Sequence, residues 1–265
     1  MANIIKIEGL DYKHIFNYFC LEIEKNTFVS LVGTNGSGKS SLIKAMIGYI
    51  KTKGYINVDN YYVDDRNIKE VRKTFGVVFD RINDNLVGDT VLDNLVFTLN
   101  NLQYDEEENK CLLKEVCDSF NLNNILNKKV SNLTNSEKQK VAIASIIIYK
   151  PKVIILDDCI NQLTRIEKDK LFEILRSYKK KYKITIILVT HDLEDTINSD
   201  RIIVMDKGKI VLDDTPFKVY KKYDKMKFLG FKLPFMIELS LKLMNLNLID
   251  HIYLDKEKLV NDLWK

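Results

Sequence analysis

The sequence predicts an α/β fold with a mostly parallel sheet at its core, and two features support this prediction. Apolar runs of strand length occur at residues 28–32, 153–156 and 184–189, and near-continuous apolar runs are typical of strands buried on both faces. Residues 41–47 and 165–180 lie between such runs and carry apolar side chains at helical spacing. Strands that alternate with helices in this way indicate a parallel sheet covered by helices.

The other elements follow from the same periodicities. The remaining strands are expected at residues 4–8, 55–58 and 76–79, and as a hairpin at 201–205 and 209–212. Helices are expected from residue 90 to about 120 and at 136–149, with acidic residues 105–108 suiting a helix N-terminus. Because the block at about 90–149 is helical and interrupts the alternation, it is predicted to be an inserted helical subdomain. An antiparallel β portion completes the predicted α/β fold.

The chain is expected to divide into a main domain, residues 1–215, and a small C-terminal extension, residues 216–265. In the extension, Pro234 begins an expected helix through residue 245. A short extended piece at 251–254 and a helix from about Lys256 are expected to follow.

The composition narrows the class of protein. Hydrophobic residues are 46% and charged residues 29% of the 265, which is ordinary for a globular protein. The net charge is only +4, which argues against a nucleic-acid-binding protein because such proteins concentrate basic residues. No stretch reaches the roughly 18 apolar residues that a membrane-spanning helix needs, so any membrane contact is expected to run through partners.

The cysteines and the N-terminus favour a cytosolic protein. Cys20, Cys111, Cys117 and Cys159 form no C-x-x-C pair, so they are expected to be reduced thiols. The N-terminus lacks a basic segment followed by a long apolar core, so no signal peptide is expected.

Residues 33–40 carry the strongest chemical signal. They fit G-x-x-x-x-G-K-[ST] and lie between an expected strand and an expected helix, as a phosphate-binding loop (P-loop) requires. Glycines let backbone N–H groups approach phosphate oxygens, and the helix N-terminus favours negative charge. Lys39 is expected to neutralise the β- and γ-phosphates of ATP, and Ser40 to ligate Mg²⁺. The residues expected to hold the nucleotide are Gly33, Thr34, Asn35, Gly36, Ser37, Gly38, Lys39, Ser40 and Ser41.

The apolar strand at 153–156 leads into two carboxylates. Asp157 is expected to hold Mg²⁺, directly or through water, and Asp158 to face the attacking water. Two acidic residues after a strand can by themselves be a simple strand cap. Because the same chain also has a P-loop, the catalytic interpretation of the two carboxylates is favoured.

Residues 131–144, which read S-N-L-T-N-S-E-K-Q-K-V-A-I-A, precede the acidic strand. This segment resembles the signature of the ABC ATPase family, which normally reads Leu-Ser-Gly-Gly-Gln before a basic helix. The resemblance implies a P-loop NTPase fold of the ABC type, with the ABC ATPase domain at residues 1–215. It also makes His191, after the last core strand, the switch histidine that reads the γ-phosphate.

The resemblance covers essentially the whole chain and narrows to the ATP-binding subunits of energy-coupling factor (ECF) transporters. Residues 80–88 look like the glutamine-loop segment of that subfamily, and residues 233–241 are similar to its C-terminal extension. The segment Asn85-Leu86-Val87-Gly88 looks more like the first of the two paired ATPases than the second.

The resemblance also implies partners. These subunits dimerise head to tail, so a second ABC ATPase subunit is expected, in a heterodimer whose composite sites join one subunit's P-loop to the other's signature. A transmembrane T subunit and a substrate-binding S subunit for vitamins or metal ions complete the importer. The chain would then lie peripherally on the cytoplasmic side of the cell membrane.

The signature departs from the family pattern at four positions. Thr134 replaces serine, Asn135 and Ser136 replace both glycines, and Glu137 replaces glutamine. We expect these side chains to crowd the approach to the γ-phosphate, and Glu137 to add like charge there. The site that uses this signature is therefore expected to close poorly around the partner's nucleotide.

Three other positions also depart from the family. Asp80 stands at the loop glutamine, where it is shorter and charged but still able to reach Mg²⁺. Asp158 stands at the catalytic glutamate, and Thr164 at the aspartate of the following loop. Because a misplacement of about 1 Å can cost on the order of 10²-fold in rate, Asp158 is expected to make hydrolysis slow.

Two questions stay open in the sequence. The adenine base is expected to stack on Tyr12 or His14, and Tyr12 can equally belong to the core. Two other functions compete with the importer: a catalytically weak, nucleotide-binding regulatory ABC subunit, and a soluble non-transport ABC ATPase acting on ribosomes or DNA. The soluble class commonly carries two ATPase units or long coiled-coil insertions, and neither fits 265 residues with one P-loop.

Overall fold

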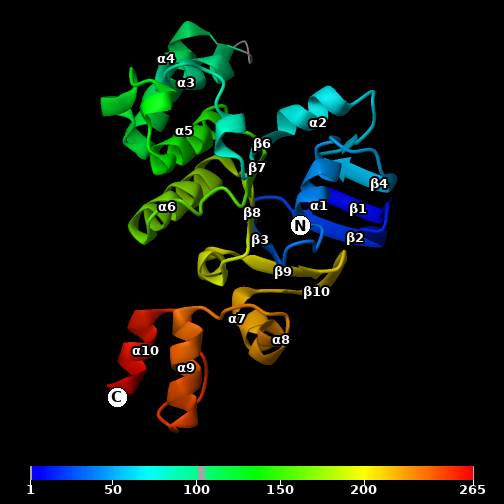
Figure 1. Cartoon of the computed structure of the whole chain (residues 1–265), viewed down its shortest axis with the longest axis vertical. Helices are drawn as coiled ribbons and strands as arrows, with labels where there is room; N and C mark the ends of the chain where they lie inside the picture. Colours follow the sequence, from blue (N-terminus) through cyan, green and yellow to red (C-terminus); the bar gives the residue numbers. More distant parts are fainter. Residues whose placement is uncertain (1, 101–104, 265) are drawn as a thin grey trace.

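The computed structural model describes residues 2–100 and 105–264, and its centre is a six-stranded sheet in the order β10-β9-β3-β8-β7-β6 (Figure 1). Strands β9, β3, β8, β7 and β6 run parallel, and β10 is antiparallel at one edge. These strands are β3 (Phe28–Gly33), β6 (Phe75–Val78), β7 (Val153–Asp157), β8 (Thr185–Thr190), β9 (Arg201–Asp206) and β10 (Lys209–Asp214). The mostly parallel core and the hairpin of β9 and β10 are confirmed.

A second, antiparallel sheet has the order β2-β1-β4-β5. Its strands are β1 (Asn3–Tyr12), β2 (Phe16–Glu24), β4 (Lys53–Val58) and β5 (Tyr61–Tyr62). Helix α1 (Lys39–Met46) shares one apolar core with both sheets, in which Ile43 is buried with Ile5 of β1 and Leu31 of β3. The antiparallel sheet confirms the predicted antiparallel portion. Because α1 packs against both sheets, the helix that follows the P-loop is held from two sides.

The sequence patterns did not reveal β2 or the short helix α2 (Ile68–Thr74). In β2, buried Phe16, Phe19, Leu21 and Ile23 break strict alternation at exposed Tyr18, which has φ of 53°. Such a bulge adds a residue to the strand and shifts its period. Helix α2 is too short for a helical period to be distinct in the sequence.

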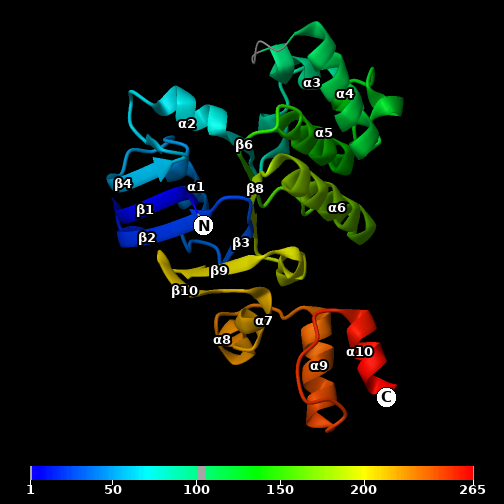
Figure 2. The same ribbon diagram turned by 180° about the vertical axis from the view of Figure 1, so that it is seen from behind.

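On the side of the central sheet opposite to α1, helices α5 and α6 pack against the strands, and α3 and α4 pack on α5 (Figures 1 and 2). These helices are α3 (Val91–Asn100), α4 (Glu106–Phe120), α5 (Asn135–Ile147) and α6 (Arg165–Tyr182), with short 3₁₀ turns η1 (Ile82–Asn85), η2 (Asn123–Ile125) and η3 (Val130–Asn132). The predicted helical character of the inserted block is confirmed, except that residues 101–104 lie outside the described residues. Asp105 begins α4 by accepting a hydrogen bond from the Glu108 amide at 2.7 Å.

The C-terminal extension packs against the main domain. It contains α7 (Pro216–Tyr220), α8 (Tyr223–Phe228), α9 (Phe235–Asn245) and α10 (Lys256–Leu263), which confirms the two predicted C-terminal helices. Tyr220 and Ile237 share a buried cluster with Val32 of β3 and with Leu193, in the 3₁₀ turn η4 (Leu193–Asn198) after β8. Residues 251–254 form no strand. The division at residue 215 stays a prediction.

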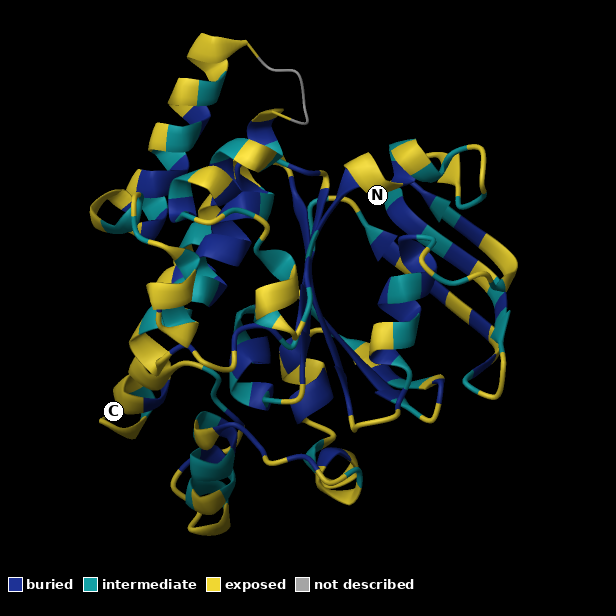
Figure 3. Cartoon of the chain, turned by 45° about the horizontal axis from the view of Figure 1, so that its top comes forward, coloured by how far each residue is buried: buried dark blue, intermediate teal, exposed yellow. Residues whose placement is uncertain are grey.

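The central strands are almost wholly buried between these layers, whereas the outer helix faces are exposed (Figure 3). Within the described residues, no helix combines the length and apolar character needed to cross a membrane.

Candidate nucleotide-binding site

Three neighbouring parallel strands bring the predicted site residues to one edge of the central sheet. Strand β8 pairs with β3 and β7, and Val32 is registered with Thr190 while Asp157 is registered with Val189. The P-loop after β3, the carboxylates at the end of β7 and His191 after β8 therefore leave the sheet on the same side. Ligands in open α/β sheets bind at the carboxyl ends of the strands.

The geometry of the P-loop depends on two of its glycines. A Cβ on Gly33 would lie 2.3 Å from Ser37 Oγ and 2.7 Å from the Met205 carbonyl oxygen, so no side chain fits there. Gly38 has φ of 104° and is the N-cap of α1, without a side chain that caps the helix. The amides in the first turn of a helix have no intrahelical acceptor, so they are available to an anion.

Lys39 is buried inside the loop, where its Nζ donates to the carbonyl oxygens of Gly33 at 2.6 Å and Thr34 at 3.2 Å. Desolvation lowers the pKa of Lys39, while the carboxylates of Asp158 and Asp157 oppose that shift. A phosphate would give this buried ammonium a charged partner that the loop carbonyls do not provide.

The other predicted loop residues differ in exposure. Thr34, Asn35, Gly36 and Ser40 are exposed, Gly38 and Ser41 are half-buried, and Ser37 is buried. The exposed positions form the open rim of the loop, and the buried ones fix its backbone.

Asp157 has the features of a metal ligand. Burial raises the pKa of Asp157 to about 6, the carboxylates of Asp158 and Asp80 add to the rise, and a hydrogen bond from Ser40 opposes it. Its Oδ1 atom is buried with no hydrogen-bond partner. Carboxylate and hydroxyl oxygens suit Mg²⁺, so Asp157 and Ser40 fit the predicted ion, with Asp80 nearby. Phosphate oxygens and water would complete the coordination of such an ion.

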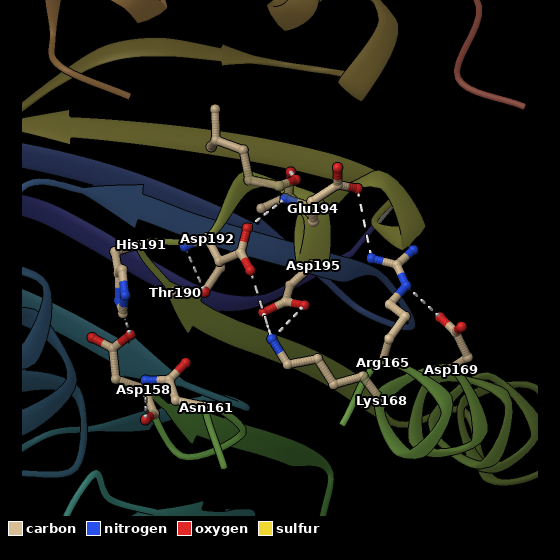
Figure 4. A network of polar contacts seen from close by, with 12 residues as sticks. Asp158, Asn161, Arg165, Lys168, Asp169, Thr190, His191, Asp192, Glu194 and Asp195 are labelled. Carbon is tan, nitrogen blue, oxygen red and sulfur yellow. Dashed lines mark hydrogen bonds and ion pairs between the residues drawn. The ribbon is translucent and has the colours of Figure 1, made fainter. Parts of the chain in front are cut away.

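Asp158 and His191 form a pair at the same edge, with Asp158 Oδ1 3.0 Å from His191 Nδ1 (Figure 4). Asp158 has φ of 49°, and its amide donates to the Val189 carbonyl at 3.0 Å, which fixes the turn after β7. The side-chain amide of Asn161 donates to the Asp158 carbonyl at 3.0 Å and adds a second anchor. The imidazole is 61% exposed, so the pair faces the open side of the site.

The signature segment forms the N-terminus of α5. Thr134 is the N-cap in a capping box, because its hydroxyl accepts from the Glu137 amide and Glu137 Oε2 accepts from the Thr134 amide at 2.7 Å. The Glu137 carboxylate also binds Lys128 Nζ at 3.1 Å, and these contacts hold the pKa of Glu137 below its usual range. Glu137 is therefore folded back onto its own helix and paired, which lessens the negative charge that we expected it to present to a γ-phosphate.

A contact that the sequence analysis missed joins the signature helix to α6. Glu167 Oε1 accepts from Ser136 Oγ at 2.7 Å and from Lys140 Nζ at 2.5 Å. Glu167 Oε2 accepts from the Thr164 amide at 2.8 Å, as part of a second capping box. The pattern T-x-x-E occurs at both helix starts and was the available signal. It predicts the caps but not the contact between the helices.

Tyr12 and His14 lie together at the turn between β1 and β2, on the wall of a cavity of about 700 Å³. This turn contacts the P-loop, because a Cβ on Gly38 would lie 3.1 Å from the Phe16 ring. Tyr12 is half-buried against the core and His14 is exposed. The choice between them as the base-stacking residue stays a prediction.

The fold and this sheet edge define the class of the protein: it is a P-loop ATPase. The family model for ABC transporters matches residues 16–161. The energy-coupling factor transporter ATP-binding protein EcfA1 of Ligilactobacillus salivarius is 31% identical, over 98% of this chain and 95% of that protein. EcfA1 of Leuconostoc mesenteroides is 32% identical, over 98% of this chain and 97% of its own length. The chain therefore belongs to the ABC transporter family, among the ATP-binding proteins of energy-coupling factor transporters.

Solved structures agree with this fold. CbiO1 from Clostridium perfringens, described as part of the ABC transporter complex cbiONQ, has a TM-score of 0.77 and 25% identity, over 90% of this chain and 99% of CbiO1. A dimeric ATP-binding cassette in a post-hydrolysis state with ADP and Pi has a TM-score of 0.71 and 24% identity, over 80% of this chain and 98% of that one. At 24% identity, the similarity to the second structure shows only that the two chains share a fold.

Proposed function

We propose that this chain is the ATP-binding subunit of an ECF-type importer, on the cytoplasmic face of the cell membrane. It would pair with a second ATPase subunit and act on a transmembrane T subunit that carries an S subunit for a vitamin or a metal ion. The observation that carries the proposal is the placement of Lys39, Asp157 and His191 at one sheet edge, in a chain similar to ECF ATPases over nearly its whole length.

ATP binding would use the loop and the first turn of α1. The free first-turn amides and the buried ammonium of Lys39 provide positive potential where the β- and γ-phosphates would lie. Ser40 and Asp157 would hold Mg²⁺, which neutralises phosphate charge when bound. The unpartnered Oδ1 of Asp157 supports this assignment.

Hydrolysis at this loop is proposed to be slow. Asp158 would orient the attacking water, and His191 would hold the Asp158 carboxylate by the 3.0 Å contact and read the γ-phosphate. An aspartate reaches about one methylene less far than the family's glutamate, and about 1 Å of displacement can cost on the order of 10²-fold in rate. We therefore infer an asymmetric heterodimer in which this chain binds ATP strongly and contributes weakly to turnover.

The T subunit is proposed to dock in a groove next to the glutamine-loop segment. A cavity of about 550 Å³ lies between α2, α3 and α5, lined in part by Asn85, Val87 and Phe97. Val87 is 68% exposed and Phe97 50% exposed, which is unusual for apolar side chains this close together. Asp80 begins the same segment and lies beside Asp157, so movement in the groove would reach the nucleotide.

The test of coupling uses the full chain expressed with its candidate partners and purified from membranes. Phe97→Asp is expected to abolish copurification with the membrane subunit and to leave nucleotide binding intact. Tyr49→Asp is the matched control, because Tyr49 is also aromatic and 71% exposed but does not line the groove. Equal copurification of both variants would contradict docking at this groove.

The test of asymmetry uses turnover of the same complex. Asp158→Asn is expected to leave most of the turnover, whereas removal of the partner's catalytic acid is expected to abolish it. Equal losses from the two changes would contradict the asymmetry. No turnover from any assembly would instead favour the non-hydrolysing regulatory subunit, which the changed signature keeps as a second candidate.

A further inference from the structure

Glu194 connects the C-terminal extension to helix α6, which follows the loop that carries Asp158. It lies in η4, three residues after His191, and its Oε1 accepts a hydrogen bond from the Phe235 amide at 2.5 Å. Its Oε2 lies 3.6 Å from Arg165 Nη1, at the start of α6 (Figure 4). One carboxylate therefore contacts two segments that come from different parts of the chain.

The Phe235 amide, which donates its hydrogen bond to Glu194, is the first amide of helix α9. Its N-cap is Pro234, whose side chain provides no capping acceptor. The first amides of a helix need acceptors from outside the helix, and the N-terminus favours negative charge. Glu194 supplies both from the main domain, so the start of α9 is tied to the loop that carries His191.

Contacts on both sides of η4 limit how it can move. On the α6 side, Lys168 Nζ binds the buried Asp195 carboxylate at 2.8 and 3.0 Å. On the extension side, the hydroxyl of fully buried Tyr220 donates to the Leu193 carbonyl at 3.0 Å. A turn clamped in this way is expected to move with the two elements that hold it.

We infer that Glu194 is a positioning residue through which the C-terminal extension fixes the loop of His191, and with it the pair of His191 and Asp158. A shift of α9 away from η4 releases the Phe235 amide from Glu194. The loop after β8 then loses one of its tethers, while the P-loop keeps all of its own contacts. The state of the extension thereby acts on hydrolysis and leaves ATP binding unaffected.

The test removes one hydrogen-bond donor, the backbone N–H of residue 235. Phe235→Pro deletes the amide that donates to Glu194, at the first position of a helix, where proline fits. Phe235→Ala is the matched control, because it removes the same 65%-exposed ring and keeps the amide. Both variants lack the ring, so their difference reports the lost amide donor together with the displacement of the Glu194 carboxylate by the proline Cδ, which are two parts of breaking one contact.

Two readouts are expected to separate the variants. In hydrogen exchange of the full chain with ATP, Phe235→Pro is expected to speed exchange at residues 193–198 about tenfold relative to Phe235→Ala, the change that loss of one charged hydrogen bond gives, with residues 33–41 unchanged. In a purified complex whose partner site has been inactivated, it is expected to lower kcat at this chain's own site about threefold to tenfold, with an unchanged KM for ATP.

A second variant guards against a general loss of structure. Glu194→Gln keeps an acceptor for the Phe235 amide but loses the charge opposite Arg165, so its exchange is expected to lie between wild type and Phe235→Pro. Equal exchange in Phe235→Pro and Phe235→Ala would overturn the inference, as would a rise in KM without a fall in kcat. The exchange experiment needs no partner, so its outcome is independent of the importer proposal.

Discussion

Ser136 donates a hydrogen bond to Glu167 at 2.7 Å, and this contact joins the signature helix α5 to helix α6. The ABC signature that this segment resembles has glycine at the position of Ser136, and a glycine has no hydroxyl to form such a bond. Lys140, one turn further along α5, binds the same Glu167 oxygen at 2.5 Å. Ser136 therefore has a structural partner within its own subunit, and helix α5 is tied to helix α6, which follows the loop that carries Asp158.

Glu167 is expected to make stability depend on pH. The hydrogen bond from Lys140, with those from the Thr164 amide and Ser136, lowers the pKa of Glu167 from 4.5 to about 2. A lowered folded-state pKa gives stability that is present above the unfolded value and is lost as the pH falls from about 4.5 to about 2. Glu167→Gln is expected to cost on the order of 1–3 kcal/mol at pH 7, and the difference from wild type should shrink toward pH 2. Urea denaturation at several pH values measures it, and a difference that does not change with pH would contradict the assignment.

Lys39→Ala is expected to weaken ATP binding by roughly 10- to 100-fold, the effect of losing a charged hydrogen bond. Lys44→Ala is the control, because Lys44 is a half-buried lysine at the other end of the same helix. Equilibrium titration with ATP measures both affinities. An unchanged affinity of the Lys39→Ala variant for ATP would contradict the proposed nucleotide site.

Asp158→Glu is expected to raise turnover at this chain's own P-loop. The longer side chain brings the carboxylate forward by about one methylene, so turnover is expected to rise by up to roughly 10²-fold. The measurement is steady-state ATP hydrolysis in a complex whose other site has been inactivated. Asp158→Asn serves as the control, and a glutamate variant no faster than wild type would show that the short side chain does not limit the rate.

Asp59→Ala is expected to destabilise the fold by about 1–3 kcal/mol. The Asp59 side chain is 6% exposed and binds Lys25 Nζ at 2.8 Å and Lys152 Nζ, so it connects the two sheets. Burial would raise the pKa of Asp59, but the two ammonium groups lower it below its usual value.

The control for this prediction is Asp65→Ala. Asp65 pairs with Lys51, and both side chains are more than 80% exposed, so the loss is expected to stay below about 0.5 kcal/mol. Denaturant midpoints of the two variants measure the difference. Similar midpoints would show that the ion pairs of buried Asp59 add nothing to stability.

The periodicity of the chain predicted the strands of the central sheet, because both of their faces are buried and their apolar runs are continuous. It failed for β2, where the bulge at Tyr18 breaks the alternation. The roles of the predicted site residues stay predictions, but the sheet brings them to one edge, because parallel strands end on the same side.

The sequence by itself determined the P-loop and the acidic strand end, because these depend on residues close together in the chain: Gly33 to Ser40, and Asp157 with Asp158. It also showed the family resemblance. Only the tertiary structure decided that Glu137 pairs with Lys128, that Ser136 binds Glu167, and that Glu194 accepts from the amide of Phe235. Those contacts join residues from 9 to 41 positions apart. No local pattern encodes them, because they exist only once the helices have packed.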